Sequence, residues 1–355
     1  MYCLDFRAVA SYKSLFIRPM RRLASIVVLL ALAASCGRKK APPSPESPAA
    51  VKGLGAVPAE ANVILRFDIE RLRDSPVFRQ AVSYLLAADL DDKSKLDALL
   101  AKCHFDPSRD LRSVLLAFVG PKALLVAEGK FDEATLSECV GGLASERGGA
   151  LAKKTVAGAA AYVAHGAEPE ETWFAFVGKE TVLVAENEDL LTRARDPAAA
   201  KVTGAAAKTA LLAKADQKRP IWGVGTVPPS LGEAFVAVTE GAVKHPPAAV
   251  TGWAEMADGL QLEVTFAFAD AVDAQALVEF AKKQLEALEI MAQMAGLEGV
   301  VKRIKVEPSD KIVRVSLALD KRELEDLAQR LEAGSDEPAD DQEPIDMKEG
   351  NSHEH

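Results

Sequence analysis

The pattern of apolar and polar positions divides residues 57–331 into short strands and longer amphipathic helices. Apolar runs and alternating patterns predict strands at residues 62–69, 112–119, 123–128, 155–164, 173–177, 181–186, 221–227, 249–256, 260–269, 300–307 and 312–319. A period of about 3.6 residues predicts helices at residues 72–88, 93–103, 132–143, 188–195, 231–243, 273–295 and 322–331. Because most strands follow one another across short turns, we expect an α+β protein of antiparallel β-hairpins packed with helices.

One hairpin–helix unit occurs twice in the first half of the chain. Residues 117–128 and 175–186 are identical at eight of twelve aligned positions, at a separation of 58 residues. Each unit is followed by an acidic helix start, Asp132-Glu133 or Glu188-Asp189, which suits the positive end of a helix dipole. The repeat predicts a layered antiparallel sheet with helices on one face.

The second half of the chain shows the same order of hairpin, helix, hairpin and helix. We therefore expect two related α+β domains, at residues 57–200 and 201–334. The longest predicted helix, residues 273–295, places Leu277, Leu285 and Met291 along one apolar face. On that pattern Met291 and Met294 are interpreted as core residues rather than as a copper site.

A short apolar segment precedes a cysteine near the N-terminus. Met20-Arg21-Arg22 is a cationic start, residues 23–34 are apolar, and Ser35-Cys36 follows. This order predicts a signal peptide over residues 1–35, with Met20 as the expected true start. The stretch at residues 32–36 resembles a bacterial lipobox, although Ala33 stands where Leu is commoner, so we expect Cys36 to be lipidated after cleavage.

Two other interpretations of this segment stay open, an ordinary secretory signal and a transmembrane helix. A membrane-spanning helix needs about 20 apolar residues, more than this run supplies, and Arg22 and Arg38 flank it. Gly37 stands where an Asp would favour retention in the inner membrane. We therefore expect an outer-membrane lipoprotein that faces the periplasm or the outside.

Two segments without an apolar period flank the predicted domains. Residues 36–56 contain four prolines and the basic triplet Arg38-Lys39-Lys40, which predicts an extended tether behind the lipidated cysteine. Residues 335–355 carry eight acidic residues against one lysine, which predicts a disordered acidic tail.

Composition and charge narrow the classes of partner. Apolar residues make up 49% of the chain, which supports packed cores rather than disorder. Loss of residues 1–35 removes five basic residues and one acidic residue, so the formal charge moves from −9 to about −13. A chain this acidic is a poor partner for nucleic acid.

Two cysteines, Cys103 and Cys139, lie within the first predicted domain. An exported protein meets an oxidising compartment, so these residues form a possible disulfide. The alternative is a pair of buried thiols, which pack as small apolar side chains.

The sequence offers no assembled catalytic or metal-binding motif. HExxH, CxxC and GxSxG are absent, and no phosphate-binding glycine loop follows a strand. The cluster Asp89, Asp91, Asp92 and Asp97 faintly resembles a calcium loop but lacks its turn glycine and closing Glu. We expect no catalytic residue, no metal, no cofactor and no enzymatic activity.

Three features together resemble uncharacterised lipoproteins of myxobacteria and related deltaproteobacteria. They are the lipobox, the stretch VPAEANV at residues 57–63 running into DIERL at residues 68–72, and the hairpin–helix repeats. The resemblance implies export, lipid anchoring and a tandem α/β architecture, and it carries no catalytic or binding residues. We expect a non-enzymatic binding or interaction protein of the cell envelope, held at the membrane by the lipid on Cys36 and contacting an unknown envelope protein. The alternative is a carrier of a small apolar molecule in a cleft between the two domains.

Overall fold

The structure is a computed structural model that describes residues 52–79, 103, 106–146, 148–166, 171–294 and 296–327 of the 355-residue chain. The predicted signal peptide, Cys36 and the predicted acidic tail lie outside these residues. Most of the helix predicted at residues 93–103 also lies outside them.

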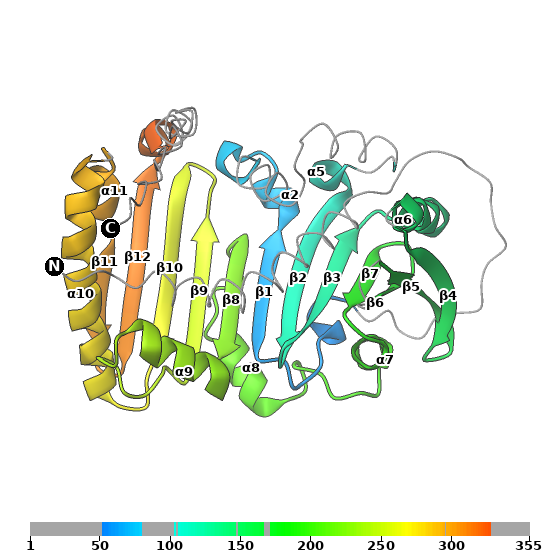
Figure 1. The fold of residues 1–355 in the computed structure, drawn as a ribbon, viewed down its shortest axis with the longest axis horizontal. Coiled ribbons are helices and arrows are strands. Elements are labelled where there is room, and N and C mark those ends of the chain that lie inside the picture. Colours follow the sequence, from blue (N-terminus) through cyan, green and yellow to red (C-terminus); the bar gives the residue numbers. More distant parts are fainter. Residues whose placement is uncertain are drawn as a thin grey trace, which may run out of the picture.

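Within the described residues, twelve antiparallel strands form a single sheet (Figure 1). The strands are β1 (Val63–Asp68), β2 (Leu111–Val119), β3 (Lys122–Gly129), β4 (Ala150–Val156), β5 (Ala159–His165), β6 (Glu171–Val177), β7 (Thr181–Ala185), β8 (Ile221–Thr226), β9 (Ala249–Glu255), β10 (Gly259–Ala267), β11 (Lys305–Ser309) and β12 (Ile312–Asp320). Their order is β11-β12-β10-β9-β8-β1-β2-β3-β7-β6-β5-β4. Together with the helices, this sheet confirms the predicted α+β class of antiparallel hairpins.

The described helices are α2 (Ile69–Leu72), α5 (Pro107–Asp110), α6 (Glu133–Glu146), α7 (Glu188–Arg195), α8 (Ala206–Leu212), α9 (Pro229–Val238), α10 (Ala271–Met294) and α11 (Glu298–Val301), preceded by the 3-10 helix η1 (Gly53–Ala56). Residues 76–79 and 321–327 are also helical. Helix α7 begins where the sequence predicts it, because the Asn187 side chain accepts a hydrogen bond from the Leu190 amide and Glu188 and Asp189 fill the first turn.

The sheet is continuous between the two halves of the chain. Strand β1 pairs with β8 in antiparallel register, with Val63 opposite Gly225 and Phe67 opposite Ile221. On each side of this seam the chain forms a hairpin, then a long helix, then outer strands. The division into two domains at residue 200 stays a prediction about folding units, because both halves share this one sheet.

The repeated hairpins lie side by side in the sheet. Strand β3 pairs with β7, with Leu125 opposite Val184 and Val126 opposite Leu183. A shift of 58 residues converts each of these pairs into the other, so a local two-fold axis relates the hairpins β2–β3 and β6–β7. The sequence repeat is therefore also a repeat in space.

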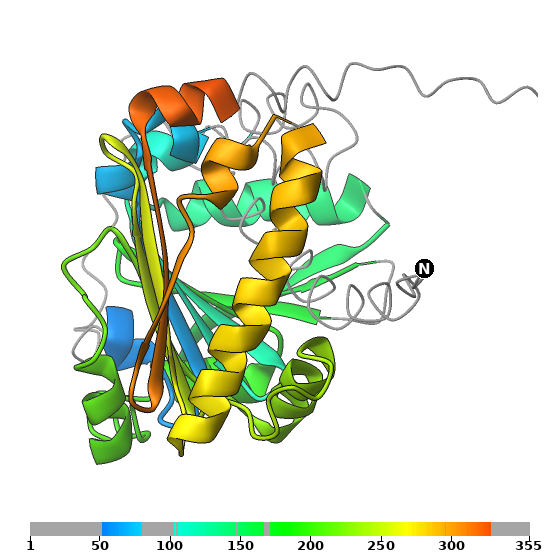
Figure 2. The same cartoon turned by 90° about the vertical axis from the view of Figure 1, so that its left-hand side faces the viewer.

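Helices cover both faces of the sheet, so the prediction of helices on one face is wrong. We call the side that carries α6, α9 and α10 the inner face and the side that carries α7 and α8 the outer face (Figure 2). Leu136 and Val140 of α6 pack on the inner face, and Leu190 and Leu211 pack on the outer face. The reason is composition: all five residues of β7 are buried, so neither side of this strand faces water.

Two predicted strands differ from the structure. The single strand expected at residues 155–164 is a hairpin, because Ala157 and Gly158 both have positive φ, 50° and 76°, and reverse the chain between β4 and β5. The strand expected from residue 300 begins only at Lys305, since residues 298–301 form α11 instead.

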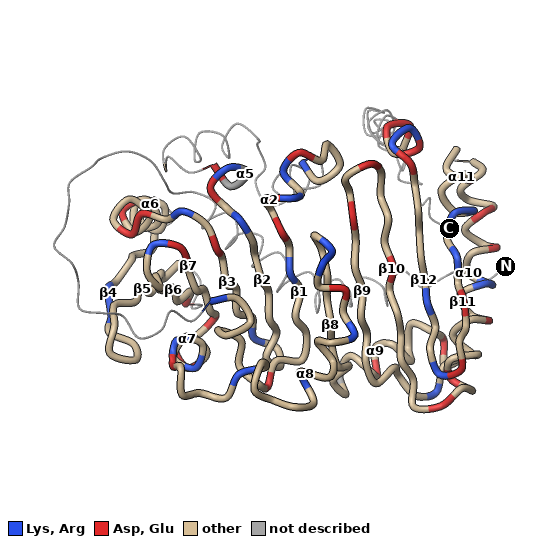
Figure 3. Tube along the Cα trace, turned by 180° about the vertical axis from the view of Figure 1, so that it is seen from behind, with Lys and Arg blue, Asp and Glu red and all other residues tan. Residues whose placement is uncertain are grey.

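The outer face of the second half is polar. Gln261 and Glu263 of β10 and Arg314 of β12 point to this side, and Arg314 forms a 3.3 Å ion pair with Glu263. Figure 3 shows acidic and basic residues interspersed along the chain. This alternation places the apolar side chains of β10 and β12 on the inner face.

Candidate functional surfaces

The middle of the inner face carries a row of apolar side chains across five neighbouring strands. Phe67, Ile221, Ala254, Leu262 and Leu317 lie opposite one another on β1, β8, β9, β10 and β12. All five are only half-buried, whereas β3 and β7 in the first half are almost wholly buried. In Figure 1 these strands lie between α10 at one end of the sheet and α6 towards the other.

The next row of the inner face has a centre without side chains. Gly223 of β8 lies opposite Gly252 of β9. On either side of this pair, Leu65 of β1 lies opposite Gly223, and Val264 of β10 lies opposite Gly252. A Cβ atom added to Gly223 would meet Leu65 Cδ2 at 2.5 Å, so glycine leaves room for this leucine. The inner face is therefore an apolar surface that spans the seam between the two halves.

A second apolar surface lies on α10. Seven large apolar side chains of the described residues are exposed, and five of them belong to this helix: Val272, Leu288, Ile290, Met291 and Met294. Met291 is 54% exposed and Met294 is 82% exposed. The interpretation of these two methionines as core residues is wrong.

The helical period explains why α10 has two apolar sides. Successive residues are about 100° apart around a helix, so Ala287, Ile290, Met291 and Met294 share an arc of about 100°. We call these four residues the α10 stripe. The buried residues Leu277, Val278 and Ala292 occupy a separate arc, which packs towards β11 and β12. A surface helix normally needs only one apolar face, and the sheet already covers that one.

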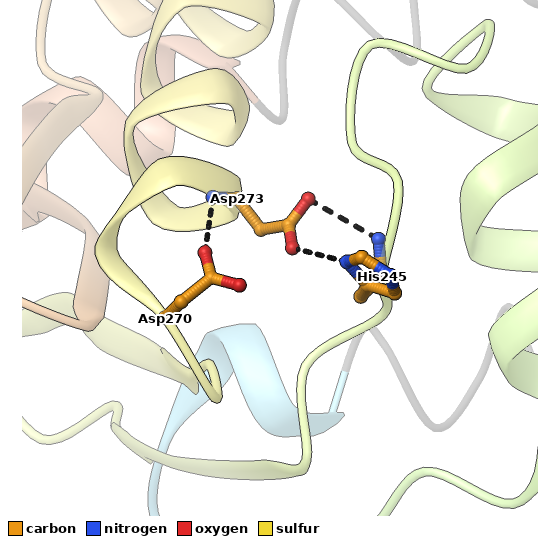
Figure 4. Close-up of side chains that lie close together, drawn as sticks. All are labelled: His245, Asp270 and Asp273. Carbon is orange, nitrogen blue, oxygen red and sulfur yellow. Dashed lines mark hydrogen bonds and ion pairs between the residues drawn. The ribbon is translucent and has the colours of Figure 1, made fainter.

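The N-terminus of α10 holds a cluster of possible metal ligands, His245, Asp270 and Asp273 (Figure 4). One ligand atom from each lies within 4.8 Å of the others. The Nδ1 atom of His245 is 2.8 Å from Oδ2 of Asp273, and the backbone N–H groups of Lys244 and His245 donate to Oδ1 of Asp273. Asp270 Oδ1 accepts from the backbone N–H groups of Val272 and Asp273, as a helix cap does.

These contacts account for the cluster without a metal ion. Burial acts to raise the pKa of Asp273, but hydrogen bonds from the His245 ring and from two backbone amides outweigh it, so the pKa lies below its ordinary value. The Asp273 carboxylate is almost fully buried while the His245 ring is largely exposed. These hydrogen bonds hold the loop before β9 against the start of α10.

A charged group on the outer face joins the two halves of the chain. Arg219 donates to Glu255 at 3.0 Å and to Asp216 at 3.1 Å, and its guanidinium lies 3.9 Å from the ring centre of Trp253. Arg71 of α2 also pairs with Glu255, at 3.3 Å. The hydrogen bond that Arg219 donates to Glu255 is the main cause of a raised pKa for Arg219. Each charge in this group has a partner, so the group is structural.

The predicted site residues fall in different places. Cys36 lies outside the described residues. Cys103 and Cys139 are joined by a disulfide in the structure, with their Cα atoms 5.4 Å apart; Cys139 belongs to α6, and both cysteines are buried in the core of the inner face. In the part of the chain that the structure describes, no helix combines the length and apolarity needed to cross a membrane.

Fold and surfaces together define an α+β protein with one large antiparallel sheet and apolar surface on its inner face and on α10. No family model matches the chain, and no curated protein matches it. One solved structure, titled "Structure of crystal form I of TP0453", is similar over 80% of this chain and 98% of that one, with 12% identity and a TM-score of 0.44. A likeness at this level carries no argument about function.

Sequence reasoning missed both apolar surfaces. The period of α10 identifies an amphipathic helix but not which apolar side chains the sheet covers. The row across β1, β8, β9, β10 and β12 depends on the pairing of β1 with β8, and these strands are more than 150 residues apart in sequence. The one available signal for the stripe was the excess of apolar residues near the end of α10, at residues 287–294.

Proposed function

We propose that this chain is an exported lipoprotein, anchored through an acylated Cys36, whose folded body is a non-enzymatic binding module of the cell envelope. The observation that supports a binding role is the concentration of exposed apolar side chains on α10, since soluble proteins rarely leave such side chains together without a partner. The lipobox and the Pro-rich tether at residues 36–56 support the anchor. Gly37 supports the outer membrane as its location.

The anchor and the binding role have separate tests. Growth with radiolabelled palmitate should label the wild-type protein and leave a Cys36→Ala variant unlabelled; label in the variant would refute acylation at this residue. An unbiased substrate screen tests the non-enzymatic role. Turnover of any substrate that one point mutation abolishes would refute it.

The second candidate function is transport of a small apolar molecule. The half-buried row Phe67, Ile221, Ala254, Leu262 and Leu317 favours it, because an apolar ligand laid on this row would remove these side chains from water. Native mass spectrometry of protein purified without detergent should then find a co-purified apolar molecule. A Leu262→Glu variant should lose this molecule, while Glu263→Gln, on the polar outer face, should keep it. Ligand-free wild-type protein would count against this candidate.

A further inference from the structure

We propose that the α10 stripe, Ala287, Ile290, Met291 and Met294, rests in the interface of the same bilayer that holds the lipid anchor. This inference rests on the proposed function, because it takes the acylated Cys36 as the attachment point. It adds an orientation of the body, with the α10 end of the sheet against the membrane.

The stripe has the features of a helix surface that binds in the membrane interface. It occupies the last two turns of a helix about 36 Å long, at about 1.5 Å per residue. Lys283 lies on the same arc one turn earlier and is exposed, so its methylene groups can lie along an apolar surface while the ammonium group reaches water. The acidic residues Glu279 and Glu286 lie on a neighbouring arc, away from the centre of the stripe.

The length of the tether places the bilayer within reach. Fifteen residues lie between Cys36 and Lys52, the first described residue, and at about 3.1 Å per residue an extended tether spans about 50 Å. Anchoring turns contact between stripe and bilayer into an intramolecular event, so a contact too weak to recruit the free protein is sufficient to orient the anchored one.

A second copy of the chain fits the stripe less well. A stable protein–protein interface buries about 800 Å² on each partner, and four apolar side chains of this size supply much less. A bilayer needs no shape-complementary partner surface, so a narrow helical stripe is enough. The charges on the exposed side of α10 are mixed, so the contact depends on apolar burial rather than on anionic headgroups.

The place of α10 in the molecule indicates which end of the sheet lies at the membrane. In Figure 1 α10 lies at one end of the long axis and β4 lies at the other. With the stripe against the bilayer, the α10 end of the sheet lies at the membrane, and the row of apolar side chains on the inner face lies between α10 and the β4 end.

Photocrosslinking in cells tests the proposal. Met291→p-benzoylphenylalanine places a photoreactive group on the stripe, and Val238→p-benzoylphenylalanine places it on α9, where Val238 is likewise exposed at 62%. Irradiated membranes should give a phospholipid adduct at position 291, identified by mass spectrometry, at least five-fold above that at position 238. Thermal unfolding of both variants must match the wild type, which exposed positions permit.

The other outcomes would overturn the proposal. A covalent dimer or a crosslink to another protein at position 291 would assign the stripe to a protein partner. Equal lipid labelling at both positions, or no lipid labelling at position 291, would refute the proposed orientation of the body at the membrane. In the Cys36→Ala background, soluble protein irradiated without membranes should give no lipid adduct, and an adduct there would indicate a carried lipid instead. If the Cys36→Ala variant stays in the membrane fraction, the proposed lipid anchor is refuted. Photocrosslinking at position 291 in that fraction still tests whether the stripe contacts lipid.

Discussion

The Nδ1 atom of His245 lies 2.8 Å from Oδ2 of the buried carboxylate of Asp273, and the two residues join the loop before β9 to the first turn of α10. Oδ1 of the same carboxylate accepts the backbone N–H groups of Lys244 and His245. One side chain therefore holds three donors from the loop. This contact holds the first turn of α10, while Leu277 and Val278 pack the helix against β11 and β12.

Removal of the Asp273 charge should lower stability in a pH-dependent way. The pKa of Asp273 is below its ordinary value, so the ionised carboxylate stabilises the fold above the unfolded-state pKa of about 3.9. This contribution is lost as the pH falls through the lower pKa of the folded state. Asp273→Asn should cost about 1–3 kcal/mol at pH 7 in urea unfolding.

The control for this prediction is Glu279→Gln, an exposed acid on the same helix, which should change stability by less than about 0.5 kcal/mol. The difference between wild type and Asp273→Asn should shrink as the pH is lowered towards 3. A difference of the same size at pH 3 and pH 7 would show that the carboxylate charge does not stabilise this contact.

The repeated hairpins should be equally sensitive to loss of their buried leucines. Leu125 and Leu183 are related by the 58-residue repeat, and both are almost completely buried. Each Leu→Ala change should cost about 2–5 kcal/mol, because it removes apolar contacts and leaves a cavity. Leu288→Ala on exposed α10 should stay within about 0.5 kcal/mol of wild type. Chemical denaturation measures all three, and an equal loss at all three positions would contradict the burial described for them.

Local signals in the sequence predicted much of the fold. The start of α7 was predictable because Asn187 and two acidic residues mark it. The β9–β10 hairpin was predictable because Asp258-Gly259 between two apolar runs favours a turn. The β4–β5 turn was not, since Ala157 has no special preference for positive φ. The pairing of β1 with β8 is a contact between distant segments, and no local pattern specifies it. The apolar surfaces follow from that pairing and from the packing of α10, so the sequence could predict their residue types but not their exposure.

Two glycines should respond to alanine in opposite directions. Gly259 has φ +139° at the β9–β10 turn, and an added Cβ would collide with the Leu319 carbonyl oxygen. Gly259→Ala should therefore destabilise the protein by more than about 1 kcal/mol. Gly142 lies inside α6 with open space around its Cα, so Gly142→Ala should stabilise by about 0.5–1 kcal/mol. A shift of the two melting temperatures in the same direction would contradict the geometry of one of the sites.

The disulfide between Cys103 and Cys139 should contribute strongly to stability. It closes a loop with a sequence separation of 36, for which loss of chain entropy in the unfolded state amounts to about 4 kcal/mol. Reduction with dithiothreitol should lower the midpoint of urea unfolding accordingly. The Cys103→Ser/Cys139→Ser double variant should show the lower midpoint with and without the reductant. A wild-type midpoint that does not respond to reduction, with free thiols verified, would contradict this contribution.

The most direct test of the account is fractionation of cells that produce the Cys36→Ala variant, with Cys3→Ala as the control because Cys3 precedes the expected start at Met20. The account predicts that the Cys3→Ala protein stays with the outer membrane and that the Cys36→Ala body no longer does, although it remains folded. An intact Cys36→Ala protein that sediments with the membranes as the wild type does would contradict the lipid anchor.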